Sequence, residues 1–483
     1  MTLPAAYRPD PCFAALGPDF SDVVAPADFP KAAPRYWNQR WAREMGLDGL
    51  DAKTRQRHFH RFEPLPDNQS APLALRYHGH QFRTYNPQIG DGRGFLFAQA
   101  RDSQDRLLDF ATKGSGQTPH SRSGDGRLTL KGAVREVLAA DMLEALGVYT
   151  SKAFCVFETG EALHRGDEPS PTRSAVLTRL SHSHVRFGAF QRHAYFDRPD
   201  LVGELAAYAV ESLVPEAAAH PDGLGVGLLD AACRRSAQLA AQWMAAGFVH
   251  GVLNTDNLVV TGESFDYGPW RFLPYFEPGF TAAYFDHSGL YAYGRQPESV
   301  FWALQQLGGA LSLIAEREAL IEALSGFPDH YKRAVRMAFL HRLGLEPLDE
   351  EADGAFVTAF LDAMKITRLP FEAVFFDWFC GDPARAMASP RAEVYNTDAF
   401  AAVRDGLAAR QPVRPERLAH PYFARTEPVH LVIEAVEDVW APIAGKDDWS
   451  AFEAMLDAIA QARAGYDLGR EASGLLKPGF LQD

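Results

Sequence analysis

The stretch His250-Gly-Val-Leu-Asn-Thr-Asp-Asn257, followed nine residues later by Asp266-Tyr-Gly268, decides how this chain of 483 residues is interpreted. The side-chain oxygens of Asn257 and Asp266 are ligands of the kind that Mg²⁺ or Mn²⁺ takes together with phosphate oxygens and water. Asp256 adds a carboxylate that is either a catalytic base or a solvated loop residue. The stretch therefore predicts a metal-dependent nucleotide site near the middle of the chain.

Protein kinases use the same spacing, with a catalytic loop H-R-D-L-x-x-x-N that precedes a D-F-G turn. The distance along the chain from His250 to Asn257 matches this loop, and Asp266-Tyr-Gly268 matches the turn. Val252 stands where a kinase keeps the carboxylate that accepts the hydroxyl proton. The pattern predicts a kinase-like site that keeps its metal ligands and lacks the usual base.

The residues before this stretch predict a small β-rich unit. Strands are expected over 95–100 and 106–113, forming a hairpin with Lys113 at its end. Apolar residues at helical spacing predict a helix over 130–146 that carries Glu136, and strands over 154–158 and 174–179 follow. Because kinases hold nucleotide phosphates with a strand lysine bridged to a helix glutamate, we predict this pair, although spacing alone fits two unrelated surface residues.

The residues after the stretch predict a larger helical unit. A helix over 228–246 ends at Gly247 as a C-cap would, and further helices are expected over 299–315, 320–343, 355–364 and 449–464. The predicted fold class is α+β with the two-lobed arrangement of a protein kinase: a small β-rich N-lobe over 76–182 and a large helical C-lobe over 183–380. An N-terminal extension over 1–75, helical over 34–45, and a C-terminal helical extension over 381–483 complete the domains. Within the latter, residues 381–425 are predicted to be an irregular connection or lid.

Glycine-rich segments and arginines supply further candidates for binding a nucleotide. Glycine turns let backbone N–H groups approach phosphates, and arginine adds bidentate contacts, although such turns are also common for structural reasons alone. The candidates outside the central stretch are Gly90, Gly92, Arg93, Asp125, Gly126, Arg179 and Arg186. Four histidines are better explained as loop or core residues than as metal ligands: His78, His80, His182 and His184.

Composition narrows the choice of compartment and partner. The balance of 48 basic against 62 acidic residues gives −14, which argues against nucleic acid or an anionic membrane as a partner. Four widely separated cysteines suit a reducing compartment and form no CxxC pair for zinc. We find neither a signal peptide nor an apolar run approaching ~18 residues. The expectation is a cytoplasmic monomer.

Seven motifs lie between residues 77 and 294, and their order along the chain is more informative than any one of them alone. They are Tyr77-His-Gly-His-Gln-Phe82, Gln88-Ile-Gly-Asp-Gly-Arg93, Lys113-Gly-Ser-Gly, Ser121-Arg-Ser-Gly-Asp-Gly-Arg127, Ser183-His-Val-Arg-Phe-Gly188, His250–Asn257 and Tyr291-Ala-Tyr-Gly294. Together they resemble the selenoprotein O family, called YdiU in bacteria. The resemblance implies a kinase-like protein that binds ATP in a flipped orientation. It also implies transfer of AMP, and in some cases of UMP from UTP, to Ser, Thr or Tyr hydroxyls of other proteins.

The resemblance also implies roles for single residues. Lys113 would contact the phosphates with Glu136 as its ion-pair partner, and Asp256 would accept the proton. Asn257 and Asp266 would bind Mg²⁺. The residues that would line the nucleotide site or hold the flipped nucleotide are Gly90, Gly92, Arg93, Asp125, Gly126, Arg179 and Arg186. With the α-phosphate presented to the acceptor, the base position at Val252 would no longer lie beside the reacting atoms.

Two alternatives and one departure accompany this hypothesis. A pseudokinase scaffold that only binds nucleotide is the first alternative, and retention of the metal pair argues against it. A kinase that uses the γ-phosphate is the second, and Val252 argues against it. Many members of the family carry a selenocysteine or cysteine near the C-terminus, whereas no cysteine follows Cys380 here. We therefore expect no redox control through a C-terminal disulfide.

Overall fold

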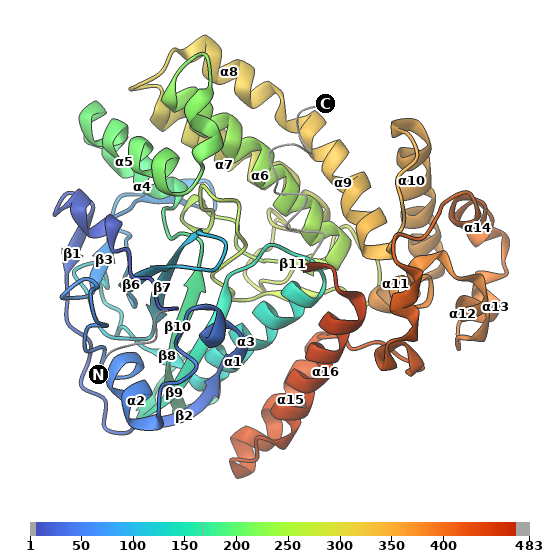
Figure 1. Ribbon diagram of the computed structural model, residues 1–483, viewed down its shortest axis with the longest axis horizontal. Coiled ribbons are helices and arrows are strands. Elements are labelled where there is room, and N and C mark those ends of the chain that lie inside the picture. Colours follow the sequence, from blue (N-terminus) through green and yellow to red (C-terminus); the bar gives the residue numbers. More distant parts are fainter. Residues whose placement is uncertain (1–5, 167, 470–483) are drawn as a thin grey trace.

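The computed structural model describes residues 6–166 and 168–469. The chain is α+β, with a large antiparallel sheet built by its first 181 residues and a body of helices built mostly by the rest (Figure 1). In the described part of the chain, every helix is too short or too polar to cross a bilayer. The C-terminal residues 470–483, to which the expectation about a terminal cysteine refers, lie outside the described residues.

Eight strands form the main sheet, in the order β1-β3-β6-β7-β10-β9-β2 with β8 beside β10. Their bounds are β1 Ser21–Val23, β2 Ala33–Trp37, β3 Leu73–Leu75, β6 Leu96–Arg101, β7 Leu107–Lys113, β8 Leu128–Thr129, β9 Lys152–Leu163 and β10 Thr172–Ser181. Two small hairpins stand apart, β4 (Gly79–Gln81) with β5 (Thr84–Asn86), and β11 (Phe248–Val249) with β12 (Arg271–Phe272). The predicted hairpin over 95–113 and the two later strands are confirmed.

Both faces of the sheet are buried, which explains why its central strands read as nearly continuous apolar runs. On one face, Leu96, Leu107 and Leu177 pack against helix α3 (Leu130–Ala145). On the other face, Phe97 and Phe110 belong to an aromatic cluster with Phe59 of helix α2 (Ala52–Phe59). Because side chains alternate along a strand, neighbouring residues are divided between the two cores.

The N-terminal segment contributes to both edges of this sheet. Strand β1 pairs with β3 at one edge, and β2 pairs with β9 at the other. The helix predicted over 34–45 is therefore wrong in its first half, since Pro34 lies in strand β2 and only α1 (Gln39–Glu44) is helical. Proline is tolerated there because β2 is an edge strand. Residues on both sides of the predicted domain boundary at 75/76 share the sheet, and the domain division stays a prediction.

Helices α4 to α16 build the rest of the molecule. The longest, α6 (Leu224–Ala246), ends as predicted at Gly247, which adopts the left-handed conformation at φ 62°. The remaining helices are α4 Phe187–Tyr195, α5 Pro199–Ser212, α7 Gln296–Leu311, α8 Arg317–Ser325, α9 Phe327–Leu343, α10 Glu350–Thr367, α11 Phe371–Asp377, α12 Pro383–Ala388, α13 Ala392–Tyr395, α14 Ala401–Ala408, α15 Ile433–Lys446 and α16 Ser450–Tyr466.

Two predictions about the helical part need correction. The helix expected over 320–343 is two helices, α8 and α9, because Gly326 and the following Phe-Pro begin a new helix. The segment 381–425 is not simply irregular, since it holds the short helices α12, α13 and α14.

The chain then returns to the sheet. Helices α15 and α16 lie beside α3 (Figure 1), where Arg463 pairs with Glu144 and Lys131 with Glu437.

Candidate active site

A polar cleft of about 630 Å³ contains most of the predicted site residues. Its wall includes Gly90, Gly92, Arg93, Lys113, Asp125, Gly126, Arg179, Arg186, Asp256 and Asp266. Glu136 lies behind the wall, and Asn257 is next to Asp256 but does not line the cleft. Clefts of 300–1,000 Å³ commonly hold cofactor-sized ligands. The structure thus brings together residues that are up to 176 positions apart in the sequence.

Four charged side chains form a closed ring at the base of the cleft. Lys113 Nζ lies 2.7 Å from Glu136 Oε2 and 2.9 Å from Asp266 Oδ1. Arg179 Nη1 lies 3.3 Å from Glu136 Oε1 and 3.1 Å from Asp266 Oδ1. Each charge therefore touches two opposite charges, which is the arrangement that makes burial of ions tolerable. We call these residues the charge ring.

Strand register explains how the charge ring assembles. Lys113 lies directly opposite Leu177 in the pairing of β7 with β10, and Arg179 is two residues further along β10. Lys113 and Arg179 therefore share the sheet face on which α3 packs. Glu136 extends from α3 toward them and is only 1% exposed. The predicted lysine–glutamate pair is present, whereas its closure by Arg179 was not predicted.

Asp266 completes the ring from a strained turn. Its backbone has φ 63°, a conformation that residues with a side chain seldom adopt. Burial alone would raise the pKa of Asp266, but Lys113 and Arg179 outweigh it and hold that pKa well below the usual range. Asp266 is therefore an anion at neutral pH.

The stretch from His250 to Asn257 is held by hydrogen bonds to several elements. His250 Nε2 lies 2.9 Å from the Phe265 carbonyl oxygen, just before Asp266. Asn254 Oδ1 accepts hydrogen bonds from Phe82 N at 3.0 Å and from the Tyr291 hydroxyl at 2.8 Å. These bonds fix the loop that presents Asp256 to the cleft.

Asp256 has properties expected of a base. Its Oδ1 is buried and, within the described part of the chain, has no hydrogen-bond partner. Burial raises its pKa to about 6, against the attraction of Arg186. A carboxylate with a free lone pair and a pKa slightly below neutrality can accept a proton near pH 7. Beside it, Asn257 Nδ2 donates to the Val252 carbonyl oxygen at 3.0 Å, which orients the amide oxygen away from that bond.

The glycines of the cleft are required by close packing. A Cβ on Gly126, at φ 69°, would lie 2.3 Å from the backbone of Gly116, and one on Gly90 would lie 2.5 Å from the His120 ring. The predicted glycine segments therefore pack closely against their neighbours in one wall of the cleft, where a side chain would not fit. Asp125 pairs with Arg165 at 2.8 Å on the rim of the same wall.

Several cleft residues were not among the sequence candidates. Asp91 pairs with Arg186 at 3.2 Å, and the Arg186 guanidinium lies 4.4 Å from the centre of the Tyr77 ring. The further basic residues of the wall are Arg122, Arg127 and Arg165. Asp91 and Tyr77 lie inside quoted motifs, so their position was a usable signal, whereas nothing in the sequence near Arg165 pointed to the cleft.

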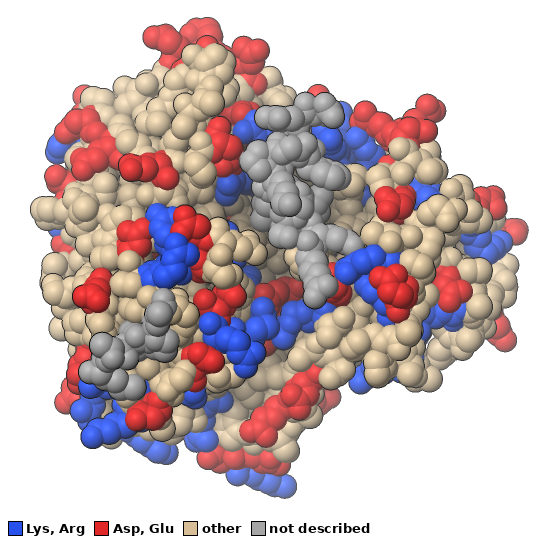
Figure 2. Space-filling model, in the orientation of Figure 1, with Lys and Arg blue, Asp and Glu red and all other residues tan. Residues whose placement is uncertain are grey.

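The cleft is basic although the protein is acidic. Seven lysine and arginine side chains line it against four aspartates, a formal surplus of three positive charges. Over the face shown in Figure 2, acidic side chains are widespread and basic ones gather in clusters. A local positive surplus in a cleft attracts anionic ligands more strongly than the net charge of −14 would suggest.

Two of the four histidines considered in the sequence, His182 and His184, lie in the core. In the residues that the structure describes, no group of three or more His, Cys, Asp or Glu side chains could hold a metal by itself. His182 hydrogen-bonds to the Tyr149 hydroxyl at 2.6 Å, and buried His184 lies 3.2 Å from Asp109. Both are core residues, as predicted.

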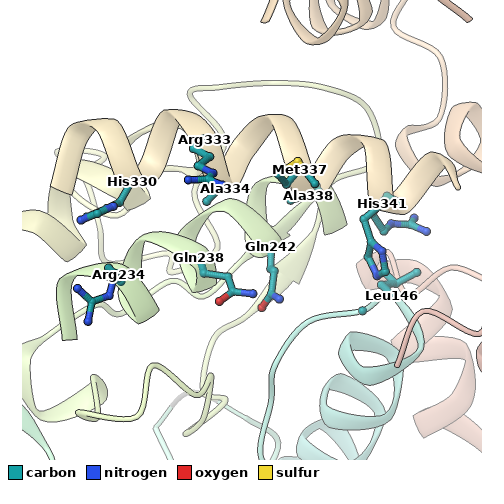
Figure 3. A pocket seen from close by; sticks show the side chains of 13 residues that line it. Leu146, Arg234, Gln238, Gln242, His330, Arg333, Ala334, Met337, Ala338 and His341 are labelled. Carbon is teal, nitrogen blue, oxygen red and sulfur yellow. The ribbon is translucent and has the colours of Figure 1, made fainter. Parts of the chain in front are cut away.

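A second cavity lies between α6 and α9 (Figure 3). Its volume is about 60 Å³, and its lining includes Gln238, Met337 and Ala338. It contains none of the predicted site residues and is too small for a nucleotide.

Comparison with known proteins identifies the family of this chain. Residues 4–460 match the family described as protein adenylyltransferase SelO. The chain belongs to the SelO family. This membership was predicted from the seven motifs, which cover a much shorter part of the chain than the match does.

Three individual relatives match between 71% and 95% of this chain. A protein nucleotidyltransferase YdiU from Gloeobacter violaceus is 43% identical over 469 residues, which cover 95% of each chain. One from Synechococcus elongatus is 42% identical over 473 residues, covering 93% of this chain and 94% of the relative. One from Trichodesmium erythraeum is 48% identical over 354 residues, covering 71% and 73%. The SelO family assignment makes this chain a nucleotidyltransferase, which confirms the predicted enzyme class.

Proposed function

We propose that this enzyme transfers AMP from ATP to Ser, Thr or Tyr hydroxyls of other proteins and releases pyrophosphate, with UTP as an alternative donor. The observation that carries the proposal is the basic cleft in which the charge ring lies beside Asp256. Family membership supports the nucleotidyl transfer, and the geometry supports the assignment of roles.

The arrangement of sheet, α3 and α6 supports a kinase-like two-lobed fold. In protein kinases, a strand lysine pairs with a helix glutamate, and a metal-binding Asp follows the catalytic loop. Here Lys113 of β7 pairs with Glu136 of α3, and Asp266 follows the loop that begins after α6. We propose that β1–β10 with α3 form the smaller lobe and the later helices the larger one.

The cleft residues would hold the nucleotide by charge. Lys113, Arg179 and Arg186 would contact phosphate oxygens, as would Arg93, and the glycine segments would let the nucleotide approach the backbone closely. Two oxygen-bearing side chains, those of Asp266 and Asn257, fit Mg²⁺ or Mn²⁺, which takes one or two carboxylates plus phosphate oxygens. When bound, such a metal neutralises charge on the phosphates and on the leaving pyrophosphate.

Asp256 would serve as the proton acceptor. The acceptor oxygen forms a bond to the α-phosphorus, the bond from that phosphorus to the pyrophosphate oxygen breaks, and the hydroxyl proton passes to the Asp256 carboxylate. The arginines of the cleft stabilise the negative charge that develops on the leaving group. Val252 is half-buried and carries no proton acceptor in its side chain, so the carboxylate of an ordinary kinase loop is replaced by Asp256, four residues later.

The decisive experiment compares ATP labelled on the α-phosphate with ATP labelled on the γ-phosphate, using wild type and Asp266→Ala. We expect label on protein only from the α-position, and none with the variant. Transfer only from the γ-position would make the chain a kinase with a replaced base. ATP binding without transfer from either position would make it a scaffold.

A further inference from the structure

Exposed aromatic side chains are gathered in one region of the described chain, around the β4–β5 hairpin. The large hydrophobic residues with the greatest exposure elsewhere are aliphatic, for example Ile366 on α10. The exposed aromatic residues and their exposed fractions are Phe82 36%, Tyr195 57%, Phe196 54%, Tyr284 77% and Phe285 41%. Among them, the rings of Phe82, Phe285 and Tyr284 contact one another, and contiguous exposed apolar surface marks sites of contact with a partner.

The tip of this hairpin is strained. Gln81 pairs with Thr84, so Phe82 and Arg83 alone make the turn, with φ 49° and 62°. A two-residue turn with both φ positive is normally made by Asn-Gly, because a side chain in this conformation costs about 1–2 kcal/mol. Strain of this kind persists where neighbouring structure enforces it, and it concentrates at functional sites. Here Phe82 N donates to Asn254 Oδ1 at 3.0 Å, and Arg83 pairs with Glu298 at 3.1 Å, so neighbouring structure holds both residues of the turn.

The hairpin runs from the cleft to the surface. A Cβ on Gly79 would lie 3.2 Å from Asp256 Oδ1, so the start of β4 passes directly against the proposed base. Gln81, two residues on, lines the cleft, and Phe82 is the next residue and is exposed. The ring of Phe82 lies 5.8 Å from that of Phe285, which in turn lies 5.1 Å from that of Tyr284. We call Phe82, Tyr284 and Phe285 the aromatic shelf.

The shelf is built onto the loop that carries Asp256. Phe82 packs 5.0 Å from the ring of Tyr291, whose hydroxyl donates to the same Asn254 Oδ1 that receives Phe82 N. The nucleotide needs the charged cleft and not the shelf, since the shelf rings lie outside the residues that line the cleft. What must reach Asp256 from outside is the hydroxyl of the acceptor.

We propose that the aromatic shelf is the docking surface for the acceptor protein. It would hold an extended segment whose apolar or aromatic side chains flank the Ser, Thr or Tyr that receives AMP. The occupant is the acceptor because the shelf adjoins the cleft. Phe82 directly follows Gln81 of the cleft wall, and its N–H donates to Asn254 in the loop that carries the proposed base. This inference rests on the proposed function.

The test uses Phe82→Asn, Tyr284→Ala and Phe285→Ala, with Ile366→Ala as the matched control for losing an exposed apolar side chain. Asparagine tolerates positive φ, so Phe82→Asn removes the ring and keeps the turn. β-Casein, an extended protein with hydroxyls among apolar residues, and heat-denatured total bacterial protein serve as acceptors for α-labelled ATP. Retained folding and nucleotide binding are measured by thermal unfolding with and without ATP and Mg²⁺.

We expect each shelf variant to lower kcat/KM for the acceptor about tenfold, the value of burying part of one aromatic side chain, with KM for ATP unchanged. Equal acceptor kinetics for wild type and shelf variants would overturn the shelf and leave the proposed function intact. Absence of α-label transfer by wild type to either acceptor would overturn both. A change from dimer to monomer in the shelf variants, measured by sedimentation, would assign the surface to a second copy instead.

Discussion

At the scale of single residues, the charge ring shows how this protein buries ions without isolating any of them. Lys113 and Glu136 are both less than 5% exposed, and each has two opposite charges within 3.3 Å. Removing one member leaves the others with an uncompensated charge in a region of low polarity.

Glu136→Gln should therefore destabilise the protein by about 3 kcal/mol and raise KM for ATP, because Lys113 and Arg179 would share a single carboxylate. Urea unfolding at pH 7.5 measures the loss. The control is Glu437→Gln on α15. This variant breaks the 2.7 Å pair with Lys131, which lies on α3 like Glu136, but the Glu437 side chain is exposed. That variant should lose at most about 1 kcal/mol. Equal losses of stability in the two variants would contradict the argument that the buried charge ring contributes more than an exposed ion pair.

Asp256→Asn should abolish transfer and yet stabilise the protein. The pKa of Asp256 is about 6 in the folded state and 3.8 as its ordinary value, so the folded protein loses stability as pH rises through this window. The variant escapes that loss, and its advantage over wild type should be about 1 kcal/mol greater at pH 7.5 than at pH 5. In wild type, kcat/KM should rise with pH around 6.

Asp447→Asn is the control of opposite sign. Hydrogen bonds from Arg173 lower the pKa of Asp447, so losing its charge should weaken the protein at neutral pH rather than strengthen it. An Asp256→Asn variant that is less stable than wild type at pH 7.5 would remove the argument that burial disfavours its charge.

Val252→Asp places a carboxylate at the position of the kinase base. We expect no efficient γ-phosphate transfer, because the proposed acceptor oxygen lies beside Asp256 and not beside residue 252. Phosphotransfer from γ-labelled ATP measures the outcome, and Val252→Asn controls for polarity without charge. Efficient kinase activity of Val252→Asp would show that the nucleotide is bound in the ordinary orientation.

At the scale of elements, helix α6 and the turn that follows it position the loop that carries the proposed base Asp256. Gly247 ends the helix at φ 62°, and a Cβ there would lie 2.6 Å from the Phe371 ring. One residue further, β11 begins and leads to His250. The conformation of one glycine thus couples the packing of α11 to the position of the loop.

Gly247→Ala should cost about 1 kcal/mol for the backbone and a further 1–3 kcal/mol for the clash, and it should lower kcat. The matched control is Gly289→Ala, which has nearly the same φ of 63° and only ordinary contacts, at 3.7 and 3.9 Å, around its added Cβ. Thermal unfolding and α-label transfer compare the two. Equal stability and equal activity would show that α11 yields to the new methyl group.

At the scale of the whole molecule, the distribution of charge matters more than its sum. The protein carries −14 overall, while its cleft holds a surplus of three positive charges. Exposed charges act on a ligand over about 10 Å at 0.1 M salt, so the cleft dominates at close range.

ATP binding should therefore weaken several-fold between 50 and 300 mM NaCl, because salt screens the attraction of the cleft for phosphates. Arg122→Gln, at an exposed position of the cleft wall, should reduce the salt dependence, whereas Arg61→Gln, exposed and outside the cleft, should leave it unchanged. Titration of ATP at several salt concentrations provides the measurement. If ATP affinity depends on salt with the same slope in wild type and in both variants, Arg122 does not contribute to the attraction of the cleft for phosphates.

Much of this was determined by the sequence alone. The strands of β6 and β7, helix α3, helix α6 with its glycine cap, and the loop from His250 to Asn257 follow from patterns within ten to twenty residues of chain. Local periodicity, capping and turn chemistry act over such distances, so they are visible without a structure. The motifs also contain most of the cleft wall, since each motif is contiguous in the sequence, whereas Thr112, His120 and Arg165 lie outside them.

Only the tertiary structure decided what depends on contacts between distant residues. Strand β2 was missed because its partner β9 lies more than 110 residues away, and an edge strand carries little signal of its own. The closure of the charge ring by Arg179, the pairing of Asp91 with Arg186 and the projection of Phe82 beyond the cleft arise from register and packing. Those are set when separate elements meet, because the free energy of burying a charge or a ring depends on which groups surround it.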